Sequence, residues 1–237
     1  MEKQYRYYDF VMAGFVTVLL LSNLLSSAKF IDFGVSVGSL RLMFDAGTLV
    51  FPISYIFGDI LTEVYGYKRS RRVIWTGFFA TMLMGFFVWL TGVLPGESGW
   101  EAGVGQTAYN AILGSITSLI AASLAAYWMG EFTNSYVLAR MKIVTQGRWL
   151  WSRTITSTLV GQGVDTLVFV SVATLLQAVG FTWANWSSVV FTSYVFKVGI
   201  EVLFTPLTMQ VVQWLKSAEK EDYYDYNTEF NPFRLDM

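Results

Sequence analysis

The sequence contains no cysteine and no histidine among its 237 residues. These absences exclude disulfides, thiolate chemistry and zinc sites built from Cys and His. Without imidazole, any proton transfer depends on carboxylates, lysine, tyrosine or hydroxyl groups. Charged residues make up only 14% of the chain, against 54% hydrophobic and 17% aromatic residues. This composition is too apolar for a soluble domain of this length and predicts a polytopic membrane protein.

Six apolar runs are long enough to cross a membrane, which takes about 20 residues. We predict spans at roughly residues 9–28, 46–65, 73–94, 107–129, 154–178 and 186–215. The first run has no cleavage site after it and is expected to be retained. The predicted fold class is therefore all-α, an integral membrane protein with six transmembrane helices in a domain of residues 1–217.

Two polar segments lie outside these spans. Residues 130–153 form the longest connection between spans, and the sequence leaves open whether they are an interfacial helix or a plain connector. Residues 218–237 are acidic, and we expect a disordered cytoplasmic tail there.

The positions of Lys and Arg predict the orientation. Thirteen of the sixteen cations lie at the termini or in the two loops on the same side as the termini. Lys29 and Arg41 lie on the opposite side, and Lys197 lies inside the last span. Because cytoplasmic segments carry the excess of positive charge, we predict cytoplasmic termini. The net charge of −1 gives no reason to expect nucleic-acid binding.

Five ionisable side chains fall inside predicted spans: Asp59, Glu63, Asp165, Lys197 and Glu201. A charge in hydrocarbon costs at least about 2.5 kcal/mol, so each is a candidate functional residue. Asp59 and Glu63 are four residues apart, as are Lys197 and Glu201, so each pair shares one helix face. Asp165 and Lys197 both lie near the membrane midplane, on neighbouring antiparallel spans. We therefore predict that Asp165 and Lys197 pair.

Some of these residues also have a purely structural interpretation. Lys197 and Glu201 could neutralise each other within one helix. Glu63 lies about one turn from the predicted boundary of its span. It could pair with the cations that follow it, which are Lys68, Arg69, Arg71 and Arg72. Asp59 lies about 10 Å inside the membrane, which leaves it without such an explanation.

Small and aromatic residues accompany the charges. Gly161 lies one turn before Asp165, and Gln162 adds an amide. Tyr55 and Tyr194 are the tyrosines nearest the polar positions, and either could stack on a flat ligand. The fourth span carries small residues at four-residue spacing, which are Gly114, Ser118, Ala122, Ala126 and Gly130. Such a stripe packs helices, either within the chain or in a homodimer.

Three strings, AGTLVFPISYIFGDILTEVYGYKRSRRVIWTGF, GQGVDTLVF and YVFKVGIEVLFTP, closely resemble motifs of the queuosine precursor transporter family, also called the vitamin uptake transporter family. The resemblance extends from about residue 22 to residue 216. It implies a six-helix inner-membrane protein that imports 7-deazaguanine precursors of queuosine for tRNA modification. Such precursors include the 7-cyano and 7-aminomethyl bases and queuine. The family's motif residues fall on Asp59, Glu63, Gly161, Gln162, Asp165 and Lys197.

The residues fit that substrate class. A deazaguanine is a neutral planar base whose N1–H and 2-amino group form a donor edge, and one carboxylate can accept from both donors. We expect Asp165 or Glu201 to bind this edge, Gln162 to contact the O6 side, and Tyr55 or Tyr194 to stack on the ring.

The other charged residues have expected roles as well. Lys197 is expected in the substrate site, while Asp59 and Glu63 would provide a polar route to the cytosol for gating or proton relay. No metal or cofactor is expected. The sequence has no nucleotide-binding loop of the Walker kind, so energy would come from an ion gradient, from trapping of the substrate or from a partner.

Two other classes of protein remain as alternatives. The chain could be the substrate-capture subunit of an energy-coupling-factor importer of a vitamin or nucleobase. Its first span lacks the stripe of small residues that such subunits use for docking. An intramembrane aspartyl protease using Asp59 and Asp165 would need two carboxyls that share a proton. Their estimated depths differ by roughly 8 Å, so we expect a transporter and not an enzyme.

Overall fold

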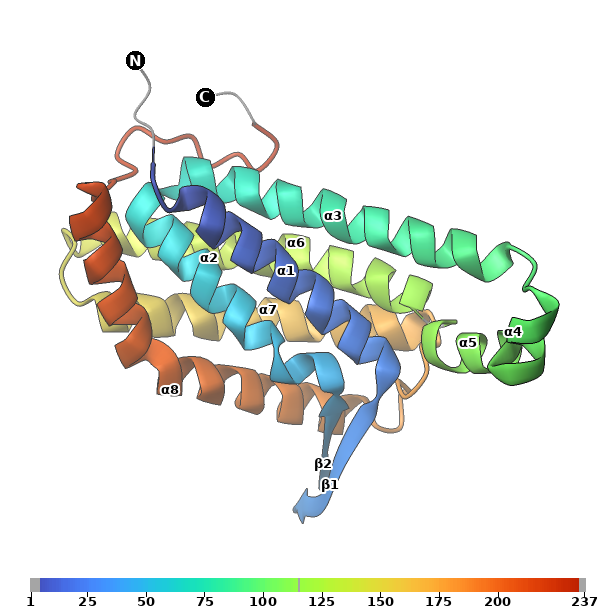
Figure 1. Cartoon of the computed structure of the whole chain (residues 1–237). Coiled ribbons are helices and arrows are strands. Elements are labelled where there is room, and N and C mark those ends of the chain that lie inside the picture. The colour runs from blue at the N-terminus through green and yellow to red at the C-terminus, as the bar shows by residue number, and fades with distance from the viewer. Residues whose placement is uncertain (1–4, 115, 235–237) are drawn as a thin grey trace.

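The computed structural model of the protein describes residues 5–114 and 116–234. Long helices form a bundle from which a β-hairpin projects (Figure 1). The helices are α1 (Tyr8–Ala28), α2 (Phe51–Tyr65), α3 (Tyr67–Val93), α4 (Ser98–Gly103), α5 (Gly105–Leu113), α6 (Ile116–Val144), α7 (Leu150–Leu175) and α8 (Trp186–Glu219). The end of the bundle where α1 begins and α8 ends is named the terminal end, and the opposite end, which carries α4 and α5, the far end.

Five helical stretches among the described residues are long and apolar enough to cross a membrane: α1, α3, the stretch Gly105–Val144 that contains α5 and α6, α7 and α8. The all-α membrane class is thus confirmed, whereas the count of six spans is not. The second predicted span, residues 46–65, is divided into a 3-10 helix, η1 (Ala46–Leu49), and the 15-residue α2. At 1.5 Å per residue, α2 is about 22 Å long, shorter than the hydrocarbon core of about 30 Å.

Two elements were not predicted. The segment between α1 and η1 forms an antiparallel hairpin of β1 (Phe30–Val37) and β2 (Leu40–Asp45). Gly38 adopts a positive φ of 62° at its turn, a conformation that glycine accepts without strain. The acidic loop after α3 contains the short α4, where the side chain of Glu97 caps the helix by accepting from the backbone N–H of Trp100.

The predicted connection of residues 130–153 is mostly helix. α6 continues without interruption to Val144, so neither a separate interfacial helix nor a plain connector describes its first part. The helix ends where Gln146 and Gly147 adopt positive φ values of 51° and 76°. As a consequence, residues 131–144 bring polar side chains into the bundle that the sequence analysis had placed outside it.

The acidic tail differs from the disorder we expected. Residues 221–234 fold back over the terminal end of the bundle (Figure 1). The backbone N–H of Tyr67 donates to the carboxylate of Asp225 at 3.1 Å, and Trp75 Nε1 donates to the carbonyl of Pro232 at 2.8 Å. The remaining residues of the expected tail, 235–237, lie outside the described part of the chain.

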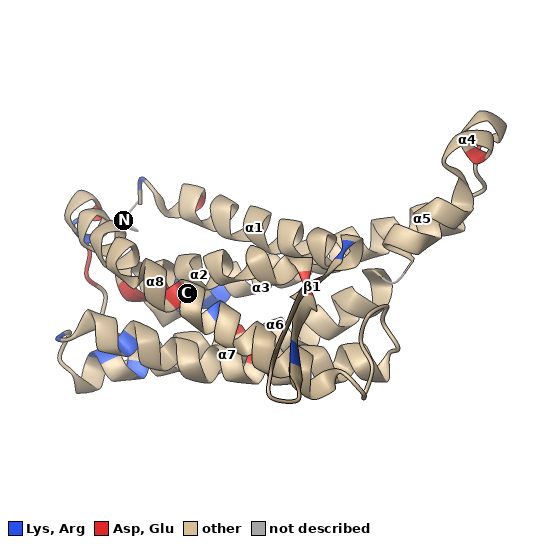
Figure 2. Ribbon diagram, turned by 90° about the horizontal axis from the view of Figure 1, so that it is seen from below, with Lys and Arg blue, Asp and Glu red and all other residues tan. Residues whose placement is uncertain are grey.

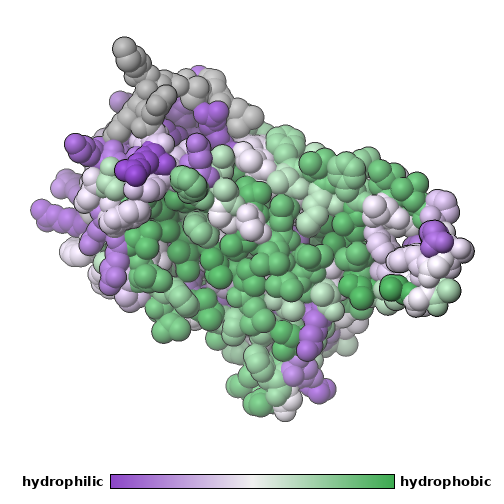
Figure 3. All heavy atoms as spheres, viewed as in Figure 1, coloured by the Kyte–Doolittle hydropathy of each residue, from purple (hydrophilic) through white to green (hydrophobic). Residues whose placement is uncertain are grey.

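Apolar and polar side chains are distributed as a membrane requires. Figure 3 shows a broad hydrophobic band over the middle of the bundle, with hydrophilic residues gathered at the terminal end and around α4. Large apolar side chains on α3, such as Phe79, Leu83 and Phe86, are more than half exposed. Such a surface is stable only in contact with lipid, and the polar residues that would destabilise it lie inside.

Candidate functional site

Eight of the buried charged side chains form two groups, one of which also includes the partly exposed Lys216 and Asp222. The central cluster consists of Asp59, Glu131, Asp165, Lys197 and Glu201, and the terminal cluster of Glu63, Lys142, Arg153, Lys216 and Asp222. Figure 2 shows charged positions gathered at the terminal end of the bundle and others along its interior helices. The central cluster holds four carboxyls and one amine, whereas the terminal cluster holds two carboxyls and three cations.

Asp165 and Lys197 form the ion pair predicted from their depth. Lys197 Nζ lies 2.9 Å from Asp165 Oδ2, and the two residues are 5% and 2% exposed. The amine also lies 4.3 Å from the centre of the Phe51 ring. A cation over an aromatic face is stabilised further when it is removed from water.

Glu201 does not neutralise Lys197. Its carboxylate accepts instead from Thr158 Oγ1 at 2.5 Å and from Gln162 Nε2 at 3.2 Å. The interpretation of Lys197 and Glu201 as an ion pair within one helix is therefore wrong in this conformation. The amine faces α7, where Asp165 is a better placed partner.

A small polar cavity reaches Asp165 and Lys197. Its wall also contains small polar side chains and two aromatic rings: Ser22, Asn23, Ser26, Thr48, Phe51 and Phe169. The cavity volume is about 20 Å³, enough for roughly one water molecule. A ligand as large as a purine base enters only if the surrounding helices move apart.

A second carboxylate lines the same cavity. Asp45, at the end of β2, is 3% exposed and accepts from Ser26 Oγ at 2.5 Å and from Thr48 Oγ1 at 3.1 Å. The sequence analysis did not identify it because it stands one residue before the predicted second span. The signal was the position of an acid directly before an apolar run that starts with Ala-Gly-Thr.

Four other candidates for the substrate site do not line the cavity, and these are Tyr194, Tyr55, Gln162 and Glu201. Tyr194 lies toward the outer surface, where its hydroxyl donates to the carbonyl of Leu159 at 3.1 Å. Tyr55 is fully buried beside α7, with its hydroxyl 3.4 Å from the carbonyl of Gly161. Gln162 contacts Glu201, behind the cavity. The aromatic rings at the cavity are those of Phe51 and Phe169, which the sequence analysis did not select.

Asp59 is buried at the centre of the bundle, as its depth predicted. The carboxylate accepts from Asn134 Nδ2 at 2.8 Å. Asn134 and Glu131 were both missed, because the predicted fourth span ended at residue 129. The absence of proline and of further glycine over residues 131–144 was the signal that α6 continues.

Helices α2, α6 and α7 approach closely at three glycines. A Cβ on Gly130 would lie 2.7 Å from Asp165 Cβ, and one on Gly161 would lie 2.7 Å from Asn134 Cβ. A Cβ on Gly58 would lie 2.9 Å from Glu131 Oε2. Helices can approach this closely only where a residue has no side chain. The three glycines therefore allow the residues of the central cluster to lie close together.

The predicted small-residue stripe, of which all positions but Gly114 lie on α6, accordingly packs inside the chain over much of its length. Ala122, Ala126 and Gly130 are buried, whereas Gly114 is exposed and Ser118 is half-buried. The homodimer through this stripe stays a prediction, with Gly114 and Ser118 as its accessible positions.

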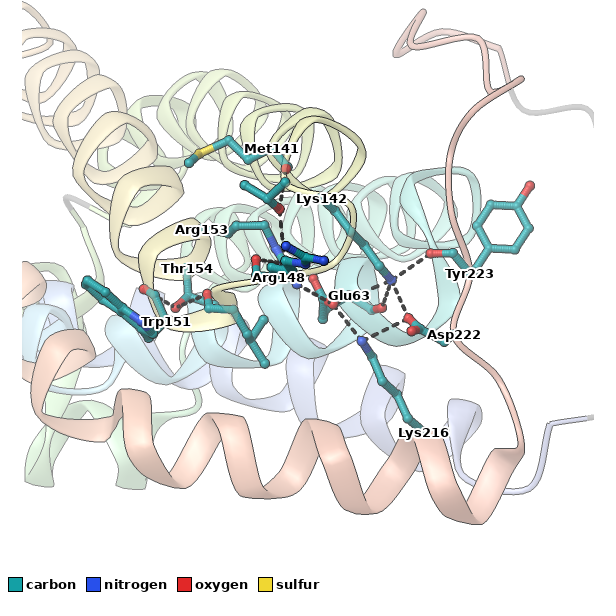
Figure 4. A network of polar contacts seen from close by, with 12 residues as sticks. Glu63, Met141, Lys142, Arg148, Trp151, Arg153, Thr154, Lys216, Asp222 and Tyr223 are labelled. Carbon is teal, nitrogen blue, oxygen red and sulfur yellow. Dashed lines mark hydrogen bonds and ion pairs between the residues drawn. The ribbon is translucent and has the colours of Figure 1, made fainter.

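The terminal cluster centres on Glu63 (Figure 4). Glu63 Oε1 lies 2.8 Å from Arg153 Nη2, 2.7 Å from Lys216 Nζ and 3.5 Å from Lys142 Nζ. The side chains of Glu63 and Arg153 are fully buried. The partners therefore come from α6, α7 and α8.

The structure does not pair Glu63 with the cations that follow it in sequence, Lys68, Arg69, Arg71 and Arg72. Gly66, with a φ of 84°, turns the chain sharply between α2 and α3. The side chain of Arg69 then donates to the carbonyl of Tyr65, and that of Arg71 donates to carbonyls of the tail.

The tail and a bend in α8 complete the terminal cluster. Pro206 lacks the N–H that a helix interior requires, and Figure 1 shows the C-terminal part of α8 turning across the terminal end. Lys216 thereby reaches Glu63 and also Asp222, at 2.9 Å. Burial alone would raise the pKa of Asp222, but hydrogen bonds and charges from Lys142 and Lys216 hold it below its ordinary value.

Spanning helices, an apolar surface and a small polar cavity at a buried ion pair define a multi-pass membrane protein with the interior of a small-molecule transporter. A family model described as "Putative vitamin uptake transporter" matches residues 45–211. The chain belongs to this transporter family, which confirms the resemblance found in the sequence and the expectation that the protein is not an enzyme.

Relatives support the same family. The chain is similar to the "Probable queuosine precursor transporter" of Bacillus subtilis (strain 168), with 28% identity over 213 residues, 89% of this chain and 86% of the relative. It is also similar to the "Queuosine precursor transporter" of Escherichia coli (strain K12), with 26% identity over 158 residues, 67% of each chain. No solved structure matches the chain.

Proposed function

We propose that the protein imports queuosine precursors across the inner membrane for use in tRNA modification. The substrates would be 7-deazaguanine bases such as 7-cyano-7-deazaguanine, 7-aminomethyl-7-deazaguanine or queuine. The names of the relatives support this proposal. The observation that carries it in the molecule is the buried ion pair of Asp165 and Lys197 at a small polar cavity.

The direction of import follows from the charge distribution. Most cations lie at the terminal end, so that end is cytoplasmic in our proposal. The cavity is lined by Ser26, close to the end of α1, and by Asp45 and Thr48 before α2. These residues lie on the far side of the midplane, so the site would load from outside and release past the terminal cluster.

The residues at the cavity suit a deazaguanine. Asp165 supplies the carboxylate that accepts from N1–H and the 2-amino group. Lys197 carries three donors and uses one on Asp165, so it would donate to O6, the contact expected of Gln162 from the sequence. Phe51, beneath the amine, offers a ring for stacking. In this arrangement Gln162 and Glu201 do not contact the base, and their hydrogen bond joins α7 to α8.

The division of the second span supports a moving element at this site. The chain is not α-helical at η1, beside the cavity, and α2 starts at Phe51. Transporters bind substrates at such discontinuous helices, where irregular backbone lines a cavity. Movement of α1, η1 and α2 away from α7 and α8 would enlarge the closed cavity to the size of the base.

The test is uptake of labelled 7-cyano-7-deazaguanine into liposomes that contain only this protein, with and without an inward proton gradient. We expect saturable uptake by the wild type, and loss of uptake in Asp165→Asn. Asp9→Asn, at an exposed position of α1, is the matched control and should transport normally.

Accumulation only under the proton gradient would identify a symporter, and mere equilibration would identify a facilitator that depends on cytosolic trapping. Absence of both uptake and exchange in the wild type would contradict autonomous transport. Such a result would favour the substrate-capture subunit of an energy-coupling-factor importer.

A further inference from the structure

Glu131 is a buried carboxyl without a partner in the part of the chain that the structure describes. It lies in the middle of α6, and none of its surface is exposed. Neither of its oxygens has a hydrogen-bond partner among the described residues, and no cation of that part of the chain pairs with it. Most buried polar groups are satisfied, so an unsatisfied carboxyl requires an explanation.

The groups around Glu131 are themselves acidic. The carboxyls whose charges act on it come from three other helices: Asp59 on α2, Asp165 on α7 and Glu201 on α8. The phenols of Tyr55 on α2 and Tyr127 on α6 also interact with it. The one amine of the central cluster, Lys197, is already paired with Asp165.

The neighbouring carboxyls have donors that Glu131 lacks. Asn134 donates to Asp59, and Thr158 donates to Glu201. An ionised Glu131, with none of its surface exposed, would be a bare charge among like charges, which is prohibitively costly. The closed conformation therefore holds a proton on Glu131.

We propose that Glu131 is the proton-binding site that couples substrate import to proton import. This inference rests on the proposed function. Glu131 takes up a proton from the outer side while the site is open there, and closure of the helices around the substrate retains it. Opening toward the terminal end hydrates the carboxyl, which releases the proton to water and becomes a carboxylate. The substrate crosses chemically unchanged, with one proton per base.

Hydroxyl groups lie between Glu131 and the terminal end, where the proton would leave. Ser135 is one turn further along α6, and its hydroxyl lies 3.1 Å from that of Thr62. Thr62 Oγ1 is also 2.9 Å from Ser70 Oγ. All three residues are buried, and hydroxyls both donate and accept, so they can pass a proton in either direction.

The test is the pH dependence of equilibrium binding of 7-cyano-7-deazaguanine to the purified protein in nanodiscs. If Glu131 must be protonated for closure around the base, the dissociation constant of the wild type rises about tenfold per pH unit above the titration of this group. Glu131→Gln fixes the side chain in a neutral form of the same shape. We expect its affinity at high pH to equal that of the wild type at low pH, without pH dependence.

Two further variants and a flux measurement sharpen the test. Glu131→Asp keeps a titrating group and should keep the pH dependence, and Glu101→Gln, at an exposed position of α4, should behave as the wild type. In liposomes with a trapped pH indicator, Glu131→Gln should lose substrate-driven proton influx but retain exchange of labelled for unlabelled base.

The outcomes separate this inference from the proposed function. Wild-type protein that binds no base at any pH contradicts the proposed function. Wild-type binding without pH dependence, or proton influx that persists in Glu131→Gln, overturns the role of Glu131 and leaves the transport of the base standing. Loss of binding at every pH in Glu131→Gln would also overturn it, because the neutral side chain should be competent.

Discussion

The terminal and central clusters each contain buried carboxyls, but their charges are balanced in opposite ways. In the terminal cluster three cations surround Glu63, with Asp222 as a second acid. The central cluster holds four carboxyls and a single amine, that of Lys197, which pairs with Asp165. An acid surrounded by cations stays ionised and holds together the helices that supply those cations. Carboxyls in excess of the available cations need a bound proton or a ligand to be stable.

This difference assigns different roles to the two regions. The terminal cluster joins α2, α6, α7, α8 and the tail, so it holds the cytoplasmic end of the bundle closed in our proposal. In the central cluster neither oxygen of Glu131 has a hydrogen-bond partner among the described residues, which in our proposal suits a site that exchanges partners during transport. The same two helices, α2 and α6, supply Glu63 and Lys142 to one cluster and Asp59 and Glu131 to the other.

The largest expected effect is a difference in the free energy of unfolding between a variant of the terminal cluster and a variant of the central cluster. Glu63→Gln leaves Arg153, Lys142 and Lys216 without their shared carboxylate, and we expect a loss of about 3–5 kcal/mol in the free energy of unfolding. Glu131→Gln removes no hydrogen bond or ion pair, and its effect should stay within about 1 kcal/mol. Reversible unfolding in mixed micelles, followed by tryptophan fluorescence, measures both.

Equal destabilisation by the two variants would contradict the distinction between the clusters. Glu101→Gln provides the baseline, because its side chain is exposed.

The next effect concerns the close approach of α6 and α7 at the central cluster. Gly161→Ala would place a Cβ 2.7 Å from Asn134 Cβ and 3.2 Å from Asn134 Cα. Because the backbone of α6 at Asn134 cannot shift without a cost in energy, we expect the free energy of unfolding to fall by about 1–3 kcal/mol. Gly163→Ala is the matched control two residues away, where the nearest atom would be Tyr194 Cε2 at 3.6 Å.

In the control, alanine's higher helix propensity should leave stability unchanged or raise it by up to about 1 kcal/mol. The same unfolding assay compares the two variants. A neutral Gly161→Ala would show that the helices are further apart at this point than the structure has them.

The smallest effect concerns the tail. The pKa of Asp222 is lowered, so its stabilisation is present above the unfolded value of about 3.9 and is lost as the pH falls through the folded pKa. Its side chain is 45% exposed, so Asp222→Asn should cost less than about 1 kcal/mol. Hydrogen exchange of residues 221–234 should be faster in the variant at pH 7 than in Glu229→Gln, an exposed control. Identical exchange would contradict a role of Asp222 in holding the tail.

The sequence predicted the class of the fold and the ion pair at the candidate site for a common physical reason. Charged residues within apolar runs are costly, so their depth alone indicated that Asp165 and Lys197 meet. The depth of a residue says nothing about residues beyond a predicted boundary, and Glu131 was missed because the fourth span was ended two residues early. Asp45 was missed in the same way, one residue before the second span.

The partners of Glu63 could not be predicted from local spacing. They come from α6, α7 and α8, and Lys216 reaches Glu63 only because α8 bends. Likewise, the choice of Tyr55 and Tyr194 as stacking residues relied on proximity in sequence. The direction of each side chain depends on helix rotation, which placed Phe51 at the cavity instead.

The most direct test of the account is the binding of two ligands to purified wild type and Asp165→Asn: 7-cyano-7-deazaguanine and its analogue without the 2-amino group. A hydrogen bond to a carboxylate contributes about 1.5–3 kcal/mol, so the wild type should bind the analogue at least about tenfold more weakly. Asp165→Asn should bind the base more weakly and discriminate less between the two. Equal binding of both ligands by the wild type, or unchanged discrimination in the variant, would contradict the assignment of Asp165 as the residue that recognises the base.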